Sequence, residues 1–186
     1  IQGNGSADGI NNHFGTSVTI NGGKIESKDL AIYQPQYGEL IITGGEIIGG
    51  TSAIEIRAGI LKISGDATIV ANGTKLSCVS NGNGSTTNGV AVAVIQHTTG
   101  LALNASITGG TLKGLAALYQ ANPEQNDASE IENVSLEVEN GTFNGQVYSE
   151  NKSGFISGGF FDALPESTLF AEGFTPVDND GNGVYE

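Results

Sequence analysis

The chain has 186 residues, with 7 Lys and Arg against 20 Asp and Glu, which gives a formal net charge of −13 at pH 7. Nucleic acids and anionic membranes bind clustered cations, so this balance disfavours both as partners. The one cysteine, Cys78, excludes an internal disulfide and is expected to be a small buried apolar side chain. The sequence has no apolar run of 18 residues, so no membrane insertion is predicted.

A short motif recurs along the chain. It consists of two apolar residues two positions apart, a small polar residue, a Gly-Gly pair or its remnant, and another apolar residue. Its copies are VTINGGKI (18–25), LIITGGEI (40–47), LKISGDATI (61–69), ASITGGTL (105–112), LEVENGTF (136–143) and GFISGGFF (154–161). The first glycine or its substitute falls at 22, 44, 65, 109, 140 and 158. A period near 22 is typical of architectures built from stacked coils.

The apolar positions of the motif indicate how the coils stack. Side chains two apart on a strand share a face, so Ile20, Ile42 and Ile63 are expected to point inward and lie over one another. One coil cannot bury such a face, whereas a stack of coils builds a continuous core. The Gly-Gly pairs suit corners that need positive φ or close backbone approach. The sequence therefore predicts an all-β fold, a single right-handed parallel β-helix.

The spacing of the copies indicates how the chain is divided. Residues 1–17 are predicted to be a partial first coil or a linker, and 18–163 the coils of the β-helix. Between 61 and 104 there are either two coils, one lacking its glycines, or one coil with an insertion. The cluster SNGNGSTTNG at 80–89 favours the insertion, and the acidic run at 122–132 predicts a second one.

Residues 164–186 are predicted to cap the stack, because an open last coil would expose apolar side chains and strand edges. Pro165 and Glu166 suit the start of a short helix, and Gly173 suits its end. Two short β-like pieces around a turn follow in FTPVDNDGNGVYE, which indicates a hairpin.

The closing run, from ISGGFF (156–161) to PESTLFAEGFTPVDNDGNGVYE (165–186), resembles the end of a module that recurs in surface proteins of gut Firmicutes and related bacteria. Through the Gly-Gly coils the resemblance covers nearly the whole chain. It implies an extracellular, cell-wall-associated β-helix that is adhesin-like or glycan-binding, as a monomeric part of a larger surface protein. A weaker resemblance is to carbohydrate-binding β-helices related in shape to pectate lyases.

A candidate binding face follows from a second motif. Residues 31–34 (AIYQ) are echoed at 93–96 (AVIQ), 117–120 (ALYQ) and 146–149 (QVYS). If Ile32, Val94, Leu118 and Val147 point inward, Tyr33, Ile95, Tyr119 and Tyr148 point outward. The candidate ligand-binding residues on this face are Tyr33, Gln34, Tyr119, Gln120 and Tyr148. Aromatic rings beside amides suit sugars, which offer C–H faces and hydroxyl edges. Alternatively, these tyrosines only cover the strands or pack under the insertions.

A metal site is a weaker prediction. Asp178, Asp180 and Asn182 match the first half of a calcium-binding loop, D-x-D-x-N-G. The flanking helices of such a loop are not predicted, and the same residues suit a tight hairpin turn. Calcium held by the acidic insertion is conceivable from its charge, but no ligand spacing supports it. No other cofactor is predicted.

The chemistry of a polysaccharide lyase or glycoside hydrolase is sparse in this sequence. Such an enzyme needs grouped carboxylates on the coil face, whereas Asp8, Asp29, Asp66 and Asp127 are scattered. His13 and His97 have no recognisable catalytic partner. The sequence therefore predicts a non-catalytic cell-surface module that binds a glycan or a host or cell-surface protein, or that acts as a rigid stalk. The alternative is a lyase-like or hydrolase-like β-helix that acts on or binds acidic plant polysaccharide with calcium.

Overall fold

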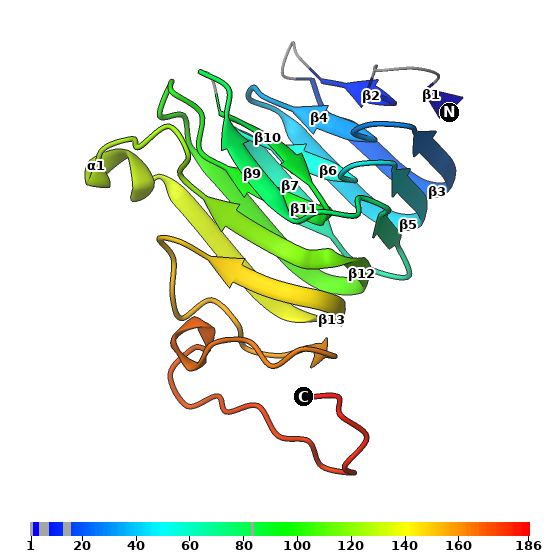
Figure 1. Ribbon diagram of the computed structural model, residues 1–186, viewed down its shortest axis with the longest axis vertical. Helices are drawn as coiled ribbons and strands as arrows, with labels where there is room; N and C mark the ends of the chain where they lie inside the picture. Colours follow the sequence, from blue (N-terminus) through cyan, green and yellow to red (C-terminus); the bar gives the residue numbers. More distant parts are fainter. Residues whose placement is uncertain (1, 4–7, 13–15, 83) are drawn as a thin grey trace.

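The computed structural model describes residues 2–3, 8–12, 16–82 and 84–186, and this part of the chain is almost entirely β (Figure 1). Its helical segments are one turn of α-helix, α1 (Ala128–Ile131), and one 3₁₀ turn, Ser167–Leu169. In the described residues no helix is long and apolar enough to cross a membrane.

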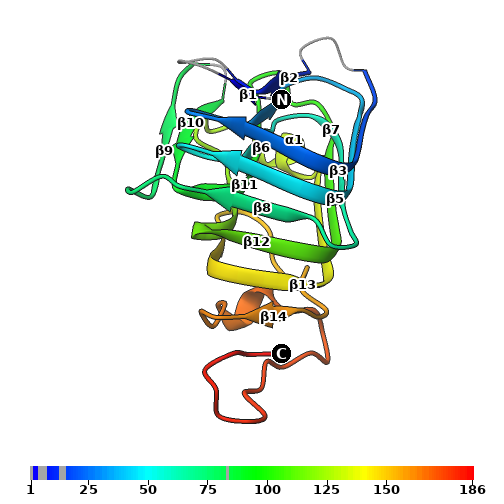
Figure 2. The same ribbon diagram turned by 90° about the vertical axis from the view of Figure 1, so that its right-hand side faces the viewer.

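The strands follow the repeat. Four long strands turn corners and lie on more than one side of the stack: β3 (Val18–Ser27), β5 (Glu39–Gly49), β12 (Leu103–Ala121) and β13 (Val134–Ser149). The short strands lie on one side each: β1 (Gln2–Gly3), β2 (Ile10–Asn11), β4 (Ile32–Gln34), β6 (Ile54–Ile56), β7 (Gly59–Ile63), β8 (Thr68–Ala71), β11 (Val90–Ile95) and β14 (Phe160–Phe161). All of these strands pair in parallel. Figure 2 shows β3, β5, β8, β12, β13 and β14 stacked on one side.

The predicted column of isoleucines is confirmed. Ile20 pairs with Ile42, and Ile42 pairs with Ile63. The ladder continues through Ile107 to Val138. A second column at the next side runs Ile25, Ile47, Ile69, Leu112, Phe143 and Phe161. These side chains belong to one buried cluster that runs the length of the stack.

The Gly-Gly corner is also confirmed, most clearly at Gly45. Its φ of +92° is strained for any residue with a side chain, and an added Cβ would lie 2.8 Å from backbone atoms of Gly22 and Gly23 in the coil before. The successive corners therefore touch backbone to backbone, which is the reason for glycine in the motif.

The long segment between 61 and 104 contributes one coil with an insertion. The ladder passes directly from β7 to β12, with Gly59 opposite Leu103 and Ile63 opposite Ile107. The extra residues form an antiparallel hairpin of β9 (Ser77–Ser80) and β10 (Ser85–Asn88). The insertion therefore begins earlier than the 80–89 cluster, because its first strand has no turn-forming residues to mark it.

The second insertion, at 122–132, carries α1 and reaches back to the hairpin. Glu124 accepts hydrogen bonds from the Ser80 hydroxyl (2.8 Å) and from the backbone N–H of Gly82 (2.9 Å). These bonds, that of the Ser80 hydroxyl first, lower the pKa of Glu124. The two insertions are thus joined to each other although they leave different coils (Figure 1).

The C-terminal residues cover the last coil, but the expected helix is reduced to the 3₁₀ turn. The backbone N–H of Ile156 donates to Leu169, and that of Ala171 donates to Ile156. This parallel pairing needs extended backbone at Phe170, so the helix cannot continue to Gly173. Tyr185 then pairs antiparallel with Phe161, and Val177 exchanges hydrogen bonds with Glu186, which closes a hairpin around 178–183.

Candidate functional site

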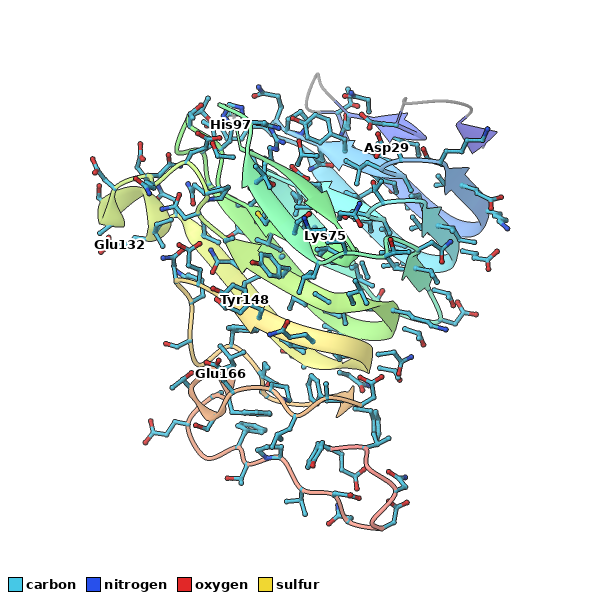
Figure 3. The ribbon with its side chains drawn as sticks, viewed as in Figure 1. Asp29, Lys75, His97, Glu132, Tyr148 and Glu166 are labelled. Atoms are coloured by element: carbon cyan, nitrogen blue, oxygen red, sulfur yellow. The ribbon has the colours of Figure 1, made fainter. Side chains whose placement is uncertain are left out.

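The candidate site lies on the side of the stack that carries the predicted tyrosines, which we call the lateral face. It is formed by β2, β4, β6, β11 and the C-terminal parts of β12 and β13. The strand ladders place a row of side chains across it, in the order Tyr33, Glu55, Ala93, Tyr119 and Tyr148. Figure 3 labels Asp29 near the N-terminal end of this region and Tyr148 near the other end.

The predicted register of β11 is wrong by two residues. Val92, not Val94, joins the inward column with Ile54 and Leu118, and Ala93, not Ile95, lies beside Tyr119. A shift of two residues keeps Val92 and Val94 inward and Ala93 and Ile95 outward, so alternation alone does not distinguish the two registers. All six side chains of β11 are buried. The outward residues are covered because the β9–β10 hairpin folds over them.

The hairpin creates a small second core outside the coils. Val90, Ala93, Ile95, Ala116 and Ala121 form this cluster, and Leu76, Cys78 and Tyr119 pack against it. Burial raises the pKa of the Cys78 thiol, which lies beside Ser85. Cys78 is therefore part of the hairpin's packing, although it is only half-buried.

A charged pair fastens the hairpin to the lateral face. Glu55 and Arg57 both project outward from the β6 region, yet they are only 2% and 4% exposed. Arg57 Nε donates to Glu55 Oε1 (2.6 Å), and the Thr87 hydroxyl of β10 donates to Glu55 Oε2 (3.0 Å). Arg57 Nη2 also donates to the carbonyl oxygen of Ser85. Burial raises the pKa of Glu55, and Arg57 opposes that shift.

Beside this pair is a cleft of about 380 Å³ between the lateral face and the hairpin. Its lining combines both charges, hydroxyls, one amide and one aromatic ring: Asp8, Asp29, Leu30, Tyr33, Thr51, Glu55, Arg57, Asn81, Ser85, Thr86 and Thr87. The guanidinium carbon of Arg57 lies 4.9 Å from the centre of the Tyr33 ring, a cation–π contact that fixes the ring in place. The cleft therefore offers a held aromatic surface among polar groups.

Two of the predicted contact residues cannot meet a ligand. Gln34 and Gln120 are fully buried. Gln34 accepts from Asn12 (3.1 Å) and donates to the carbonyl of Gly38 (3.2 Å), and Gln120 accepts from the Ser149 hydroxyl (2.7 Å). Their amides hold the loops at the edge of the stack. Because alternation turns Tyr33 outward, it turns its neighbour Gln34 inward.

Tyr119 and Tyr148 do come together as predicted. Their rings stack with centroids 4.7 Å apart and an angle of 27° between planes, and both side chains are partly exposed. Three strand steps separate Tyr33 from Tyr119, a distance of about 14 Å at the usual spacing of strands. The two aromatic features are thus distinct parts of one face.

The predicted metal residues form a turn. The carboxylate of Asp178 accepts from the backbone N–H groups of Asn182 (3.1 Å) and Gly183 (3.0 Å), and Asp180 accepts from the side chain of Asn182 (2.9 Å). Among the described residues, no group of three or more His, Cys, Asp or Glu side chains could hold a metal ion. These hydrogen bonds stabilise the turn, and they account for the Asp and Asn residues of this stretch without requiring a bound cation.

His97 does not form a catalytic arrangement within the described part of the chain. The ring of His97 bonds within its own loop, where its Nδ1 accepts from the backbone N–H of Thr99 (3.1 Å), and burial lowers its pKa. His13 lies outside the described residues.

Sequence reasoning missed most of the cleft. Asp29, Glu55, Arg57 and Thr87 were not expected to act together. One signal was available: Glu55 and Arg57 alternate with Ile54 and Ile56 on a strand, which puts both charges on the same outward face. The residues from the hairpin have no such signal, because the sequence does not show where an insertion folds.

Comparison with known proteins does not assign the chain to a family. No family model matches it, and neither the curated proteins nor the solved structures include a significant match.

Proposed function

We propose that this chain is a right-handed parallel β-helix that serves as a non-catalytic module of an extracellular surface protein and binds a glycan on its lateral face. The parallel ladders and the inward columns support the β-helix. The resemblance to bacterial surface modules supports the location, and the strongly acidic composition speaks against nucleic acid as the ligand.

The observation that carries the proposed function is the cleft around Tyr33. Sugar rings need a flat apolar surface and hydrogen-bonding groups around it, and the cleft supplies both. The ring is held in advance by Arg57, and the charged pair fixes the hairpin that forms the other wall. A ligand therefore finds the surface already arranged, which reduces the ordering cost of binding.

The lateral face favours binding over the lyase or hydrolase alternative. A cationic base for β-elimination must be free to take a proton, whereas Arg57 is committed to Glu55, to Ser85 and to the face of Tyr33. Arg57 is also a poor base at neutral pH because it stays protonated.

The proposed function predicts a loss of glycan binding in Tyr33→Ala. We expect the affinity for the best oligosaccharide on a glycan array, measured by calorimetry, to fall about fivefold, because an aromatic contact contributes about 1 kcal/mol. Tyr37→Ala is the matched control, since Tyr37 is 57% exposed and lies outside the cleft. Its affinity should be unchanged.

Two other results would contradict the proposal. If the double variant Tyr119→Ala/Tyr148→Ala loses binding while Tyr33→Ala keeps it, the stacked pair and not the cleft is the site. If plant polysaccharides incubated with the protein, with and without calcium, yield reducing or unsaturated ends above background, the module is catalytic.

A further inference from the structure

The charges of the cleft are not balanced. Its lining contains the carboxylates of Asp8, Asp29 and Glu55 and the single cation of Arg57. Glu55 and Arg57 neutralise each other, and no ion pair to Asp8 or Asp29 is found within the described residues. Within the described part of the chain the cleft therefore keeps two carboxylates that form no ion pair, although Arg57 attracts Asp8 at longer range.

Both carboxylates are held in position by neutral groups. The Thr51 hydroxyl donates to Asp29 Oδ1 (2.7 Å), and the Asn11 side chain donates to Asp8 Oδ2 (3.1 Å). Partial burial and, to a smaller extent, the nearby charge of Asp29 raise the pKa of Asp8, while the bond from Asn11 and the charge of Arg57 oppose the shift. A bound cation would relieve both the burial cost and the repulsion.

A second feature of the same cleft is its polar hairpin wall, lined by Asn81, Ser85, Thr86 and Thr87. The hydroxyl of Ser85 is enclosed and lies beside the Cys78 thiol, so it does not face a ligand. Asn81 and Thr86 are exposed, and their side chains are the polar groups that this wall presents to a sugar.

We propose that the cleft binds a sugar with a free protonated amine, an amino sugar, in preference to its neutral counterparts. This inference rests on the proposed function, because it takes the ring of Tyr33 as the surface for the sugar. The ammonium group would pair with the carboxylates of Asp8 and Asp29, and the sugar's hydroxyls would bond to the Asn81 and Thr86 side chains of the hairpin wall. A bare metal ion fits less well, because a metal needs several closely grouped ligands, and the described residues offer no group of three.

The test compares three hexamers with the same β-1,4 linkage, built from glucosamine, N-acetylglucosamine and glucose. At about 0.15 M salt, where distant charges are screened, we expect the glucosamine hexamer to bind about fivefold more tightly than the other two, because a partly exposed ion pair contributes about 1 kcal/mol. Asp29→Asn should abolish this preference, since Asn keeps the shape and can still accept from Thr51. Asp8→Asn is the second variant, and circular dichroism should show both folded as the natural chain is.

Asp127→Asn is the matched control. It removes one negative charge from the second insertion, at 122–132, where the Asp127 side chain makes no capping bond. This variant should keep the preference for the glucosamine hexamer. If Asp127→Asn reduces it as much as Asp29→Asn does, the amine is attracted only by the net charge and the proposal fails. A trilysine peptide that binds as tightly as the glucosamine hexamer would also overturn it, because the cleft would then recognise the amine alone.

The outcomes separate this inference from the proposed function. Equal binding of all three hexamers would refute the preference for an amine and leave glycan binding intact. Failure of every oligosaccharide, on the array and in solution, would refute both.

Discussion

Replacing Arg57 with alanine is expected to lower the free energy of unfolding by about 3–5 kcal/mol, because it leaves the buried Glu55 carboxylate without its partner. The substitution also removes the bond to the Ser85 carbonyl, which ties the hairpin to the lateral face. Urea or guanidinium denaturation measures the change. Lys62→Ala is the control: its pair with Glu39 is exposed and 3.8 Å long, so we expect a loss of about 0–1 kcal/mol.

The loss of unfolding free energy in Arg57→Ala has two possible sources, the unpaired charge of Glu55 and lost packing. A change of pH and a second substitution distinguish them. Burial raises the pKa of Glu55, and without Arg57 that pKa rises further. A carboxyl whose pKa is raised by folding destabilises the fold as pH rises through the folded pKa. Arg57→Ala should therefore be less destabilising at acidic pH than at pH 7. Arg57→Ala/Glu55→Gln should recover part of the loss at pH 7, and no recovery would mean that packing dominates.

Replacing Phe143 with alanine is expected to cost about 3–5 kcal/mol of unfolding free energy through the cavity it leaves. Phe143 is fully buried between Leu112 of the previous coil and Phe161 of the next, and its ring stacks on Phe161 with centroids 4.9 Å apart. Since Phe161 in turn contacts Phe170 of the C-terminal cover, the cavity also weakens the closure of the stack.

The matched control is Phe160→Ala. Phe160 is the neighbour of Phe161 in β14, and its side chain lies on the opposite face of that strand. Phe160 is 44% exposed, and we expect its removal to change the unfolding free energy by less than about 0.5 kcal/mol. Equal effects of the two substitutions would contradict the inward assignment of Phe143. Proteolysis of the C-terminal segment measures whether the Phe143→Ala loss is local or spreads along the coils.

The periodic part of the fold could be predicted from sequence because one physical requirement repeats in each coil. Ile20, Ile42 and Ile63 must lie over one another if each coil is to bury its inner face, so their spacing determines the register. The predicted register failed at β11, because a shift of two residues leaves the same side chains inward and the alternation unchanged. The prediction also failed at Phe170, where pairing with the last coil replaced the local preference for helix.

The candidate site could be predicted only in part, for a different reason. Tyr33, Tyr119 and Tyr148 follow from the repeat, since it assigns them to the outward side of one face. Gln34 and Gln120 were predicted wrongly: their amides suit sugar hydroxyls, but alternation turns both side chains inward beside the outward tyrosines. The cleft also needs residues such as Ser85 and Thr87, which reach the lateral face through the docking of a hairpin. That docking depends on long-range contacts for which the sequence has no period.

The antiparallel pairing of Tyr185 with Phe161 has a consequence for self-association. The last parallel strand would otherwise present free backbone groups on which an incoming chain could polymerise. The returning segment occupies those groups, and it does so with reversed polarity, so a further parallel coil cannot extend the ladder at this position. Addition of another chain at Phe161 is thereby blocked by the protein's own backbone.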